Sequence, residues 1–128
     1  MTAQHCVTIT IPSEAAYIRV IRLAVGAAAA LTDLDVEAIE DLRIGVDELS
    51  STLMEVSDGS DLRFELRPRT ERGLRIDAWA TRDGDEVDRE RFGFSQRILT
   101  VIADEHGFDL DGPTAHAWLV RGTEPDRP

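Results

Sequence analysis

The stretch IEDLRIGVDELSSTLMEV, residues 39–56, carries the strongest periodic pattern of the chain and decides its fold. The apolar residues recur at steps of three and four, which is the spacing of one face of an α-helix. They are Ile39, Leu42, Val46, Leu49, Leu53 and Val56. Asp35 is placed to cap the start of this helix, and Ser57, Asp58 and Gly59 are turn residues that end it. The sequence therefore predicts an amphipathic helix of about twenty residues.

The residues before this helix predict one strand and one further helix. Residues 6–11, CVTITI, alternate β-branched and polar side chains, which favours a strand that Pro12 ends. Ser13 is a candidate N-cap for a helix that reaches about Leu31. Its apolar side consists of Tyr17, Ile18, Ile21, Val25 and Ala28.

The residues after the central helix predict two β-hairpins with a third helix between them. Alternating runs at 62–66 and 74–81 form the first hairpin, around a turn at 68–73. A charged loop at 82–91 leads to a helix at 92–105, which His106 and Gly107 end. Runs at 108–110 and 115–120 form the second hairpin, and Trp79 and Trp118 are expected in the core of the sheet.

This order of elements predicts an α/β fold. Helices interleaved with hairpins favour a two-layer sandwich, in which a mixed, mostly antiparallel sheet is covered on one face by three helices. A length of 128 residues indicates one domain. We expect that domain at residues 1–121 and a frayed tail at 122–128.

Two absences in the composition exclude several chemistries. The chain has no Lys and no Asn, and all 14 of its basic residues are Arg. Schiff-base catalysis and the P-loop lysine are excluded, as is any site that needs an Asn amide. The formal net charge of −11 argues against direct binding of nucleic acid, because phosphate neutralisation needs a basic patch.

The cysteine, histidine and hydropathy patterns further restrict the cellular location and the kinds of site that we expect. Cys6 is the only cysteine, so no disulfide forms within the chain. The start of the chain does not resemble a signal peptide, and the apolar residues 23–31 are too few to span a bilayer. We therefore expect a cytoplasmic protein with no membrane contact. His5, His106 and His116 lack metal-ligand spacing, so we predict no metal site from them and expect them on the surface or in strands.

Residues 41–52, DLRIGVDELSST, resemble the N-box helix of bacterial anti-sigma factors. These proteins form the sigma-partnering, serine-kinase branch of the GHKL superfamily, the histidine-kinase-type ATPases. The expected order of elements fits over about residues 7–121, and the actinobacterial form is the most similar. The resemblance implies the Bergerat, or histidine-kinase-like, ATPase fold.

The resemblance also implies roles in binding Mg-ATP. Glu48 matches the Glu that is placed as general base, and Thr52 stands where the family has the Asn that helps to hold Mg²⁺. The two positions are four apart, so they are neighbours on one helix face. Asp83 matches the Asp that reads adenine, with Gly84 beside it. Gly93 matches a glycine of the box that opens the third helix, where backbone N–H groups meet phosphates.

Each of these motifs departs from the family pattern. Thr52 replaces the metal-binding amide with a shorter hydroxyl. After Asp83 the glycine register is shifted by one, and Asp85 and Glu86 add charge that repels a triphosphate. Bulky Phe92 and Phe94 flank Gly93. These departures favour a protein that is not an enzyme, although they leave the question open.

Two arginines of the first helix are candidates for binding a partner. The frame Tyr17-Ile18-Arg19-Val20 resembles one whose Arg contacts an acidic sigma factor surface in relatives. Arg22 lies three residues after Arg19 and shares its face. Relatives dimerise, so the resemblance implies a homodimer. The Ala-rich first helix and the strand at 6–11 offer surfaces for it.

Every candidate residue also has a plainer interpretation. Glu48 is placed as well on a solvated helix face, and Thr52 can bond to its own backbone. Asp83 can form an Asp-Gly turn, and a glycine such as Gly93 is ordinary near a helix start. Arg19 and its neighbour Arg22 can form a solvated stripe.

Three functions follow. The first is an anti-sigma factor that sequesters an alternative sigma factor by binding, and that an anti-anti-sigma protein displaces. The second is an active serine kinase of the same fold that phosphorylates its anti-anti-sigma partner with Mg-ATP, using Glu48 as base and Thr52 and Asp83 as nucleotide contacts. The third is an interaction module with no link to sigma factors, because one fold hosts many functions.

Overall fold

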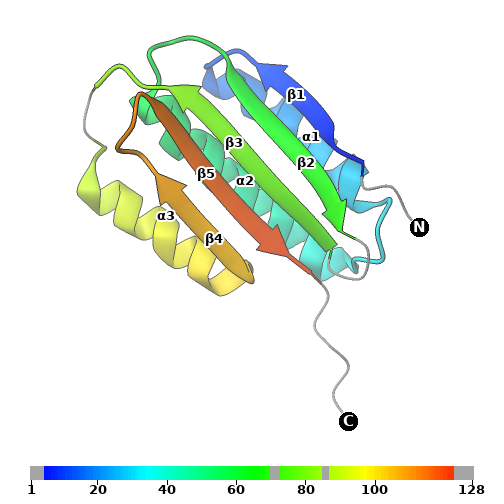
Figure 1. Cartoon of the computed structure of the whole chain (residues 1–128). Helices are drawn as coiled ribbons and strands as arrows, with labels where there is room; N and C mark the ends of the chain where they lie inside the picture. Colours follow the sequence, from blue (N-terminus) through cyan, green and yellow to red (C-terminus); the bar gives the residue numbers. More distant parts are fainter. Residues whose placement is uncertain (1–4, 70–72, 85–86, 123–128) are drawn as a thin grey trace.

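In the part of the chain that the structure describes, five strands form one antiparallel sheet, and three α-helices cover one of its faces (Figure 1). The computed structural model describes residues 5–69, 73–84 and 87–122. The strands are β1 (Val7–Ile11), β2 (Leu62–Arg69), β3 (Gly73–Thr81), β4 (Glu105–Asp109) and β5 (Thr114–Arg121). Their order across the sheet is β1-β2-β3-β5-β4. The predicted two-layer sandwich and both hairpins are confirmed.

The expected mixed sheet is wrong in one respect, because every described strand pairing is antiparallel. The helix between β3 and β4 returns the chain so that these two strands run in the same direction. The hairpin partner of β4, strand β5, then lies between them and pairs with both. The predicted turn at 68–73 is also too long, since Pro68 and Arg69 belong to β2. Residues 70–72 lie outside the described part of the chain.

The central helix α2 (Val36–Val56) matches the prediction closely. The Asp35 carboxylate accepts a hydrogen bond from the Ala38 N–H over 2.8 Å, which caps the first turn as expected. Five of the six periodic residues are fully buried against the sheet, and Ile39 is partly buried. Gly45 lets the helix approach β5, since a Cβ atom there would lie 2.5 Å from a methyl group of Leu119.

The first helix begins later than expected. A 3₁₀ turn, η1 (Ala15–Tyr17), precedes α1 (Ile18–Ala29), and neither start has a side-chain cap, so the assignment of Ser13 as N-cap is wrong. The chain turns tightly here instead, with the Glu14 N–H donating to the Pro12 carbonyl and the Tyr17 N–H to the Glu14 carbonyl. In Figure 1, α1 lies behind β1 and β2.

The third helix is shifted toward the N-terminus. It is α3 (Arg89–Ile102), it starts after Asp88, and it ends before Ala103. His106 and Gly107 do not end it as expected, because both lie in β4. Gly107 has a long-range role: a Cβ atom there would lie 2.1 Å from the ring of Trp118 on β5.

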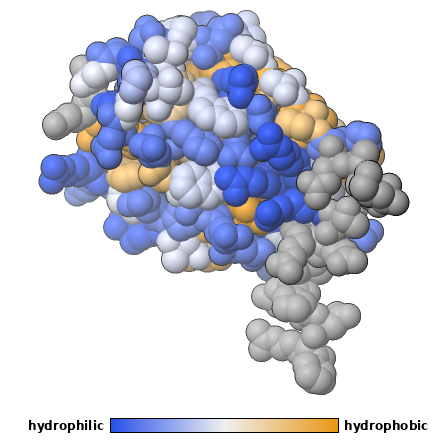
Figure 2. Space-filling view, viewed as in Figure 1, coloured by the Kyte–Doolittle hydropathy of each residue, from blue (hydrophilic) through white to orange (hydrophobic). Residues whose placement is uncertain are grey.

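The core lies between the helices and one face of the sheet, while the other face is open to solvent. Phe64, Ile76 and Leu119 point into the core from neighbouring strands. Trp79 and Trp118 were expected there, but they are half-buried on the open face, because each occupies the alternate position of its strand. Figure 2 shows the open face, whose middle is mostly hydrophilic.

An ion pair and a hydrogen bond connect the C-terminal end of β5 to the rest of the domain. Arg121 forms an ion pair with Asp41 of α2, with 3.1 Å between Nε and Oδ2. The expected frayed tail began at residue 122, but Gly122 is buried and its N–H donates to the Asp104 carboxylate over 2.8 Å. Residues 123–128 lie outside the described part of the chain.

Candidate functional site

The residue expected to act as general base is held by the neighbouring helix. The Ser95 hydroxyl on α3 donates a hydrogen bond of 2.7 Å to Oε1 of Glu48 on α2. Ser95 is 4% exposed, so this contact sits at the junction of the two helices. Glu48 therefore does not lie on a solvated helix face, which was its plainer interpretation. Its carboxylate joins α2 to α3.

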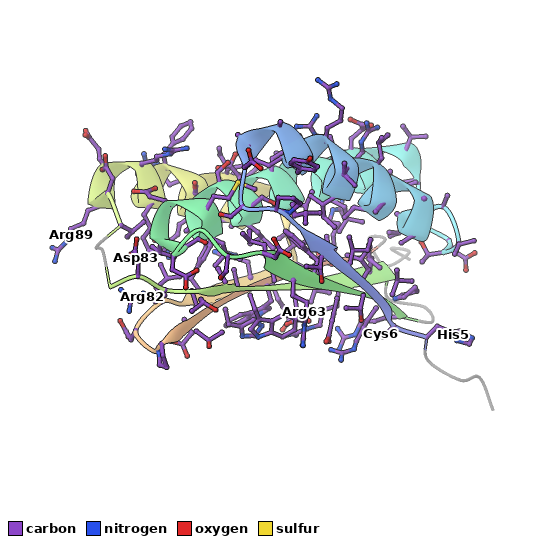
Figure 3. All side chains as sticks on the ribbon, turned by 90° about the horizontal axis from the view of Figure 1, so that it is seen from above. His5, Cys6, Arg63, Arg82, Asp83 and Arg89 are labelled. Carbon is purple, nitrogen blue, oxygen red and sulfur yellow. The ribbon has the colours of Figure 1, made fainter. Side chains whose placement is uncertain are left out.

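The other expected nucleotide residues lie near the same end of α2. Thr52 follows Glu48 by one turn and is only 3% exposed. Asp83 and Gly84 follow β3 and are exposed. The Asp83 N–H donates to the carbonyl of Val56, the last residue of α2, over 3.2 Å. Figure 3 shows Arg82 and Asp83 at this end of β3. Asp85 and Glu86 lie outside the described residues.

The start of α3 is occupied by side chains of the chain itself. The Asp88 carboxylate accepts hydrogen bonds from the N–H groups of Glu90 and Arg91, over 3.0 and 3.2 Å. The Asp88 N–H donates to the Glu55 carboxylate of α2 over 2.7 Å. Gly93 is the fifth residue of the helix, so its N–H lies beyond the four that a helix leaves without partners. The expected place of Gly93 at the helix opening is wrong.

These contacts engage some of the groups that the resemblance assigns to Mg-ATP. The Glu48 carboxylate accepts a hydrogen bond from Ser95, and Thr52, where the resemblance expects a metal-binding amide, is buried. The N–H groups that would meet phosphates at the start of α3 already bond to Asp88. The nucleotide roles of Glu48, Thr52, Asp83, Gly84 and Gly93 stay predictions, and no step of a reaction is assigned to them.

On the other side of α2, the two candidate arginines of α1 line one cavity. Its volume is about 250 Å³, and its walls are Ala15, Ala16, Ile18, Arg19, Arg22, Asp47 and Ser51. The Arg22 guanidinium donates two hydrogen bonds to Asp47, of 3.0 and 2.9 Å. These bonds and the charge of Asp47 raise the pKa of Arg22. Arg19 is exposed, and within the described residues its guanidinium makes no such pair.

Sequence reasoning missed the side chains that hold the candidates in place. Asp47 directly precedes Glu48 in the motif, and a helix position one step away faces α1 rather than α3. Asp47 lies 25 residues after Arg22, so no local sequence pattern indicated that the two side chains pair. Ser95 was likewise hidden, because its bond to Glu48 joins residues 47 apart.

The described residues contain neither a candidate metal cluster nor a candidate membrane span. No group of three or more His, Cys, Asp or Glu side chains gathers there in a way that could hold a metal ion. None of the described helices combines the length and the apolar character that crossing a membrane requires.

Comparison with known proteins identifies two similar chains. They are the anti-sigma-F factor RsbW of Mycobacterium tuberculosis strain CDC 1551 / Oshkosh and that of strain ATCC 25618 / H37Rv. Each is 30% identical over 102 residues, which cover 79% of this chain and 60% of the relative. No protein-family model matches. The similarity supports a relationship with the anti-sigma factors, although the match spans less than two thirds of these relatives.

Proposed function

We propose that this chain is an anti-sigma factor that acts by binding. It would sequester an alternative sigma factor, so that the polymerase core cannot take it up, and an anti-anti-sigma protein would compete for it. The similarity to anti-sigma-F factor RsbW carries this proposal. The contacts between α2 and α3 favour sequestration over phosphoryl transfer, because Glu48 is hydrogen-bonded to Ser95 and the N–H groups at the start of α3 are hydrogen-bonded to Asp88.

Arg19 is the proposed contact with the sigma factor. It is exposed at the rim of the cavity beside α2, and acidic residues dominate the rest of the chain. Arg22 is less available, since Asp47 holds its guanidinium in a two-bonded pair. We assign Arg22 the role of fixing α1 against α2, which keeps Arg19 in position.

The experiment that tests the proposal is a binding measurement with a sigma-F-type sigma factor. We expect a stable complex in size-exclusion chromatography and loss of sigma-dependent transcription in a purified system. Arg19→Glu should weaken binding roughly tenfold, since the reversed charge meets an acidic partner. Arg97→Glu changes the same charge on α3 and should bind as the wild type does.

Failure to form a complex with any sigma factor would contradict the proposal and favour an interaction module of another kind. Equal weakening by Arg19→Glu and Arg97→Glu would show that only the net charge matters, which would remove Arg19 from the interface.

A second prediction separates sequestration from the kinase alternative. Calorimetric titration of Mg-ATP into the protein should give no magnesium-dependent binding, because Asp88 and Ser95 occupy the groups that would meet the nucleotide. Ser95→Ala frees the Glu48 carboxylate and serves as the matched variant. Tight, magnesium-dependent binding to the wild type would revive the kinase, with ATP and Mg²⁺ as cofactors and the anti-anti-sigma protein as substrate.

We also infer that the protein is a homodimer, joined at the edge formed by β1 and α1. Strand β1 is an edge of the sheet, and its sequence VTITI contains no charge, proline or glycine that would protect the edge. The strand reads almost the same in both directions. An antiparallel pair centred on Ile9 would set Thr8 against Thr10 of a second copy and keep the apolar residues on the helix side.

Helix α1 presents an apolar stripe on the same edge. Arg22 and Gly26 lie toward α2, where they meet Asp47 and Arg43. The opposite side of the helix carries residues spaced by three and four, as in a coiled coil. These are Val20, Ala24 and Ala27 in the helix, with Tyr17 just before it and Leu31 just after it. Val20 is 48% exposed and Leu31 is 82% exposed, so a second copy would bury apolar surface in the helix layer as well as in the sheet.

Sedimentation equilibrium tests the dimer. The wild type should sediment as a dimer, and the double variant Val20→Glu/Ala27→Glu should sediment as a monomer, because carboxylates would be desolvated in the stripe. Val101→Glu is the matched control, since Val101 is 84% exposed on α3, which lies at the sheet edge opposite β1. A monomeric wild type, or dissociation by Val101→Glu to the same extent, would refute this interface.

A further inference from the structure

The open face of the sheet carries a cluster of basic and aromatic side chains that the proposed function does not use. We call it the sheet-face cluster. It comprises Arg63, Glu65, Arg67, Arg75, Asp77, Trp79, His116 and Trp118, from strands β2, β3 and β5. Strand register places these residues on one face, opposite the helices. Figure 3 shows Arg63 pointing away from the helix layer.

Cations cover anions within this cluster. The side chain of Glu65 is 14% exposed, while those of Arg63 and Arg67, which bind its two oxygens over 2.8 and 2.7 Å, are 54% and 46% exposed. Asp77 is deeper still, beneath the two-bonded guanidinium of Arg75. Within this cluster the guanidinium groups are therefore more exposed to solvent than the carboxylates they pair with, although the chain as a whole carries a net charge of −11.

The aromatic rings are already stacked on one another. The Arg63 guanidinium lies 4.6 Å from the centre of the Trp79 ring, and the His116 ring lies 4.9 Å away, nearly parallel to it. Trp118 follows His116 at 5.3 Å and fills the space above Gly107. Both faces of Trp79 are thus occupied, so this ring offers no platform on which a nucleic-acid base could stack. The cluster is instead a preorganised surface that presents guanidinium groups.

We propose that the sheet-face cluster binds a carboxylate-bearing, extended segment of a partner protein. A guanidinium has five N–H donors, and Arg75 uses its Nε and one Nη2 donor on Asp77, which leaves others for a ligand. Guanidinium groups pair with carboxylates through two parallel hydrogen bonds. Arginine and tryptophan are also the residues that most often dominate protein interfaces.

The charges around the cluster fix where such a segment lies. Strand β4 borders the face with Glu105 and Asp109, which would repel carboxylates. Strand β1 borders the other side with the neutral Thr8 and Thr10. An acidic segment therefore fits over β2 and β3, across the three arginines, and this site is separate from Arg19 and the cavity beside α2.

Tryptophan fluorescence, excited selectively over that of Tyr17, reports on this face alone, because Trp79 and Trp118 are the only tryptophans of the chain. The probe is a peptide of glutamates, titrated at low and high salt and followed by fluorescence and calorimetry. We expect a saturable signal that weakens with salt. Arg63→Gln/Arg67→Gln should weaken binding at least roughly tenfold, and Arg67→Lys, which keeps the charge but loses the paired donors, should weaken it by a smaller factor. Arg89→Gln is the matched control on α3, far from this face (Figure 3).

Each opposing outcome overturns the proposal. These outcomes are the absence of a saturable signal, equal weakening by Arg89→Gln, and tighter binding of a thymidine decanucleotide than of the glutamate peptide. The last would identify the face as a nucleic-acid surface. Unfolding midpoints of the variants, measured by circular dichroism, separate lost binding from lost structure. No sigma factor is present in the assay, so its result is independent of the anti-sigma proposal.

Discussion

Truncating Phe64 to alanine is expected to lower the free energy of unfolding by about 3–5 kcal/mol. Phe64 is fully buried on β2, where it points into the core between the sheet and the helices. Its removal deletes a large apolar surface and leaves a cavity that rigid neighbours fill only in part. Small domains are stable by about 5–15 kcal/mol, so this one change removes a large share of the total.

Urea unfolding followed by circular dichroism measures the effect. Phe64→Leu keeps most of the volume and should cost less than about 1.5 kcal/mol. Val101→Ala is the surface control, because Val101 is 84% exposed on α3 and its truncation should change stability by less than about 0.5 kcal/mol. A small effect of Phe64→Ala would mean that the layers do not pack as described.

Replacing Asp77 by asparagine is expected to cost about 2–3 kcal/mol at neutral pH. The Asp77 side chain is 4% exposed and accepts hydrogen bonds from Arg75, over 2.8 and 3.0 Å, and one of 2.8 Å from His116. An amide keeps the shape but lacks the charge, so the half-buried guanidinium loses its partner. Asp109→Asn is the matched control, since Asp109 is exposed on β4 of the same sheet.

The same variant should change how stability depends on pH. Burial raises the pKa of Asp77, but the hydrogen bonds and charges of Arg75 and His116 prevail, so the pKa lies below its ordinary value. A lowered carboxyl pKa contributes stability that is complete above the unfolded-state pKa of about 3.9 and is lost as the pH falls through the folded-state value. The difference between wild type and Asp77→Asn should therefore shrink below about pH 4. A difference that stays constant into acid would refute this account.

Local patterns predicted the elements of this fold well, and their boundaries less well. The periodic run ending at Val56 and the cap at Asp35 depend on residues within a few positions, and both are confirmed. The start of α3 was missed because Asp88, its cap, lies inside an acidic run where several residues could serve. Gly107 was expected to end a helix, because the ring of Trp118, which requires a glycine at this position, lies on another strand and gives no local signal.

The candidate site was predictable only in part. Position along α2 placed Glu48 and Thr52 on the helix as expected, but their surroundings depend on residues far along the chain. The bond from Ser95 to Glu48 could not be inferred without the docking of α3 on α2. The expected core position of Trp79 is wrong because alternation separates the two faces of a strand but does not indicate which face the helices cover.

The shallow attachment of α3 has a consequence for motion. Only Ser95 and Leu99 are buried in this helix, whereas α2 buries residues along its whole length. Backbone amides exchange with solvent fastest where few apolar contacts must break to open the structure. In hydrogen-exchange experiments α3 should therefore lose protection before α2 and the central strands. Its opening would uncover the Glu48 side of α2 without unfolding the rest of the domain.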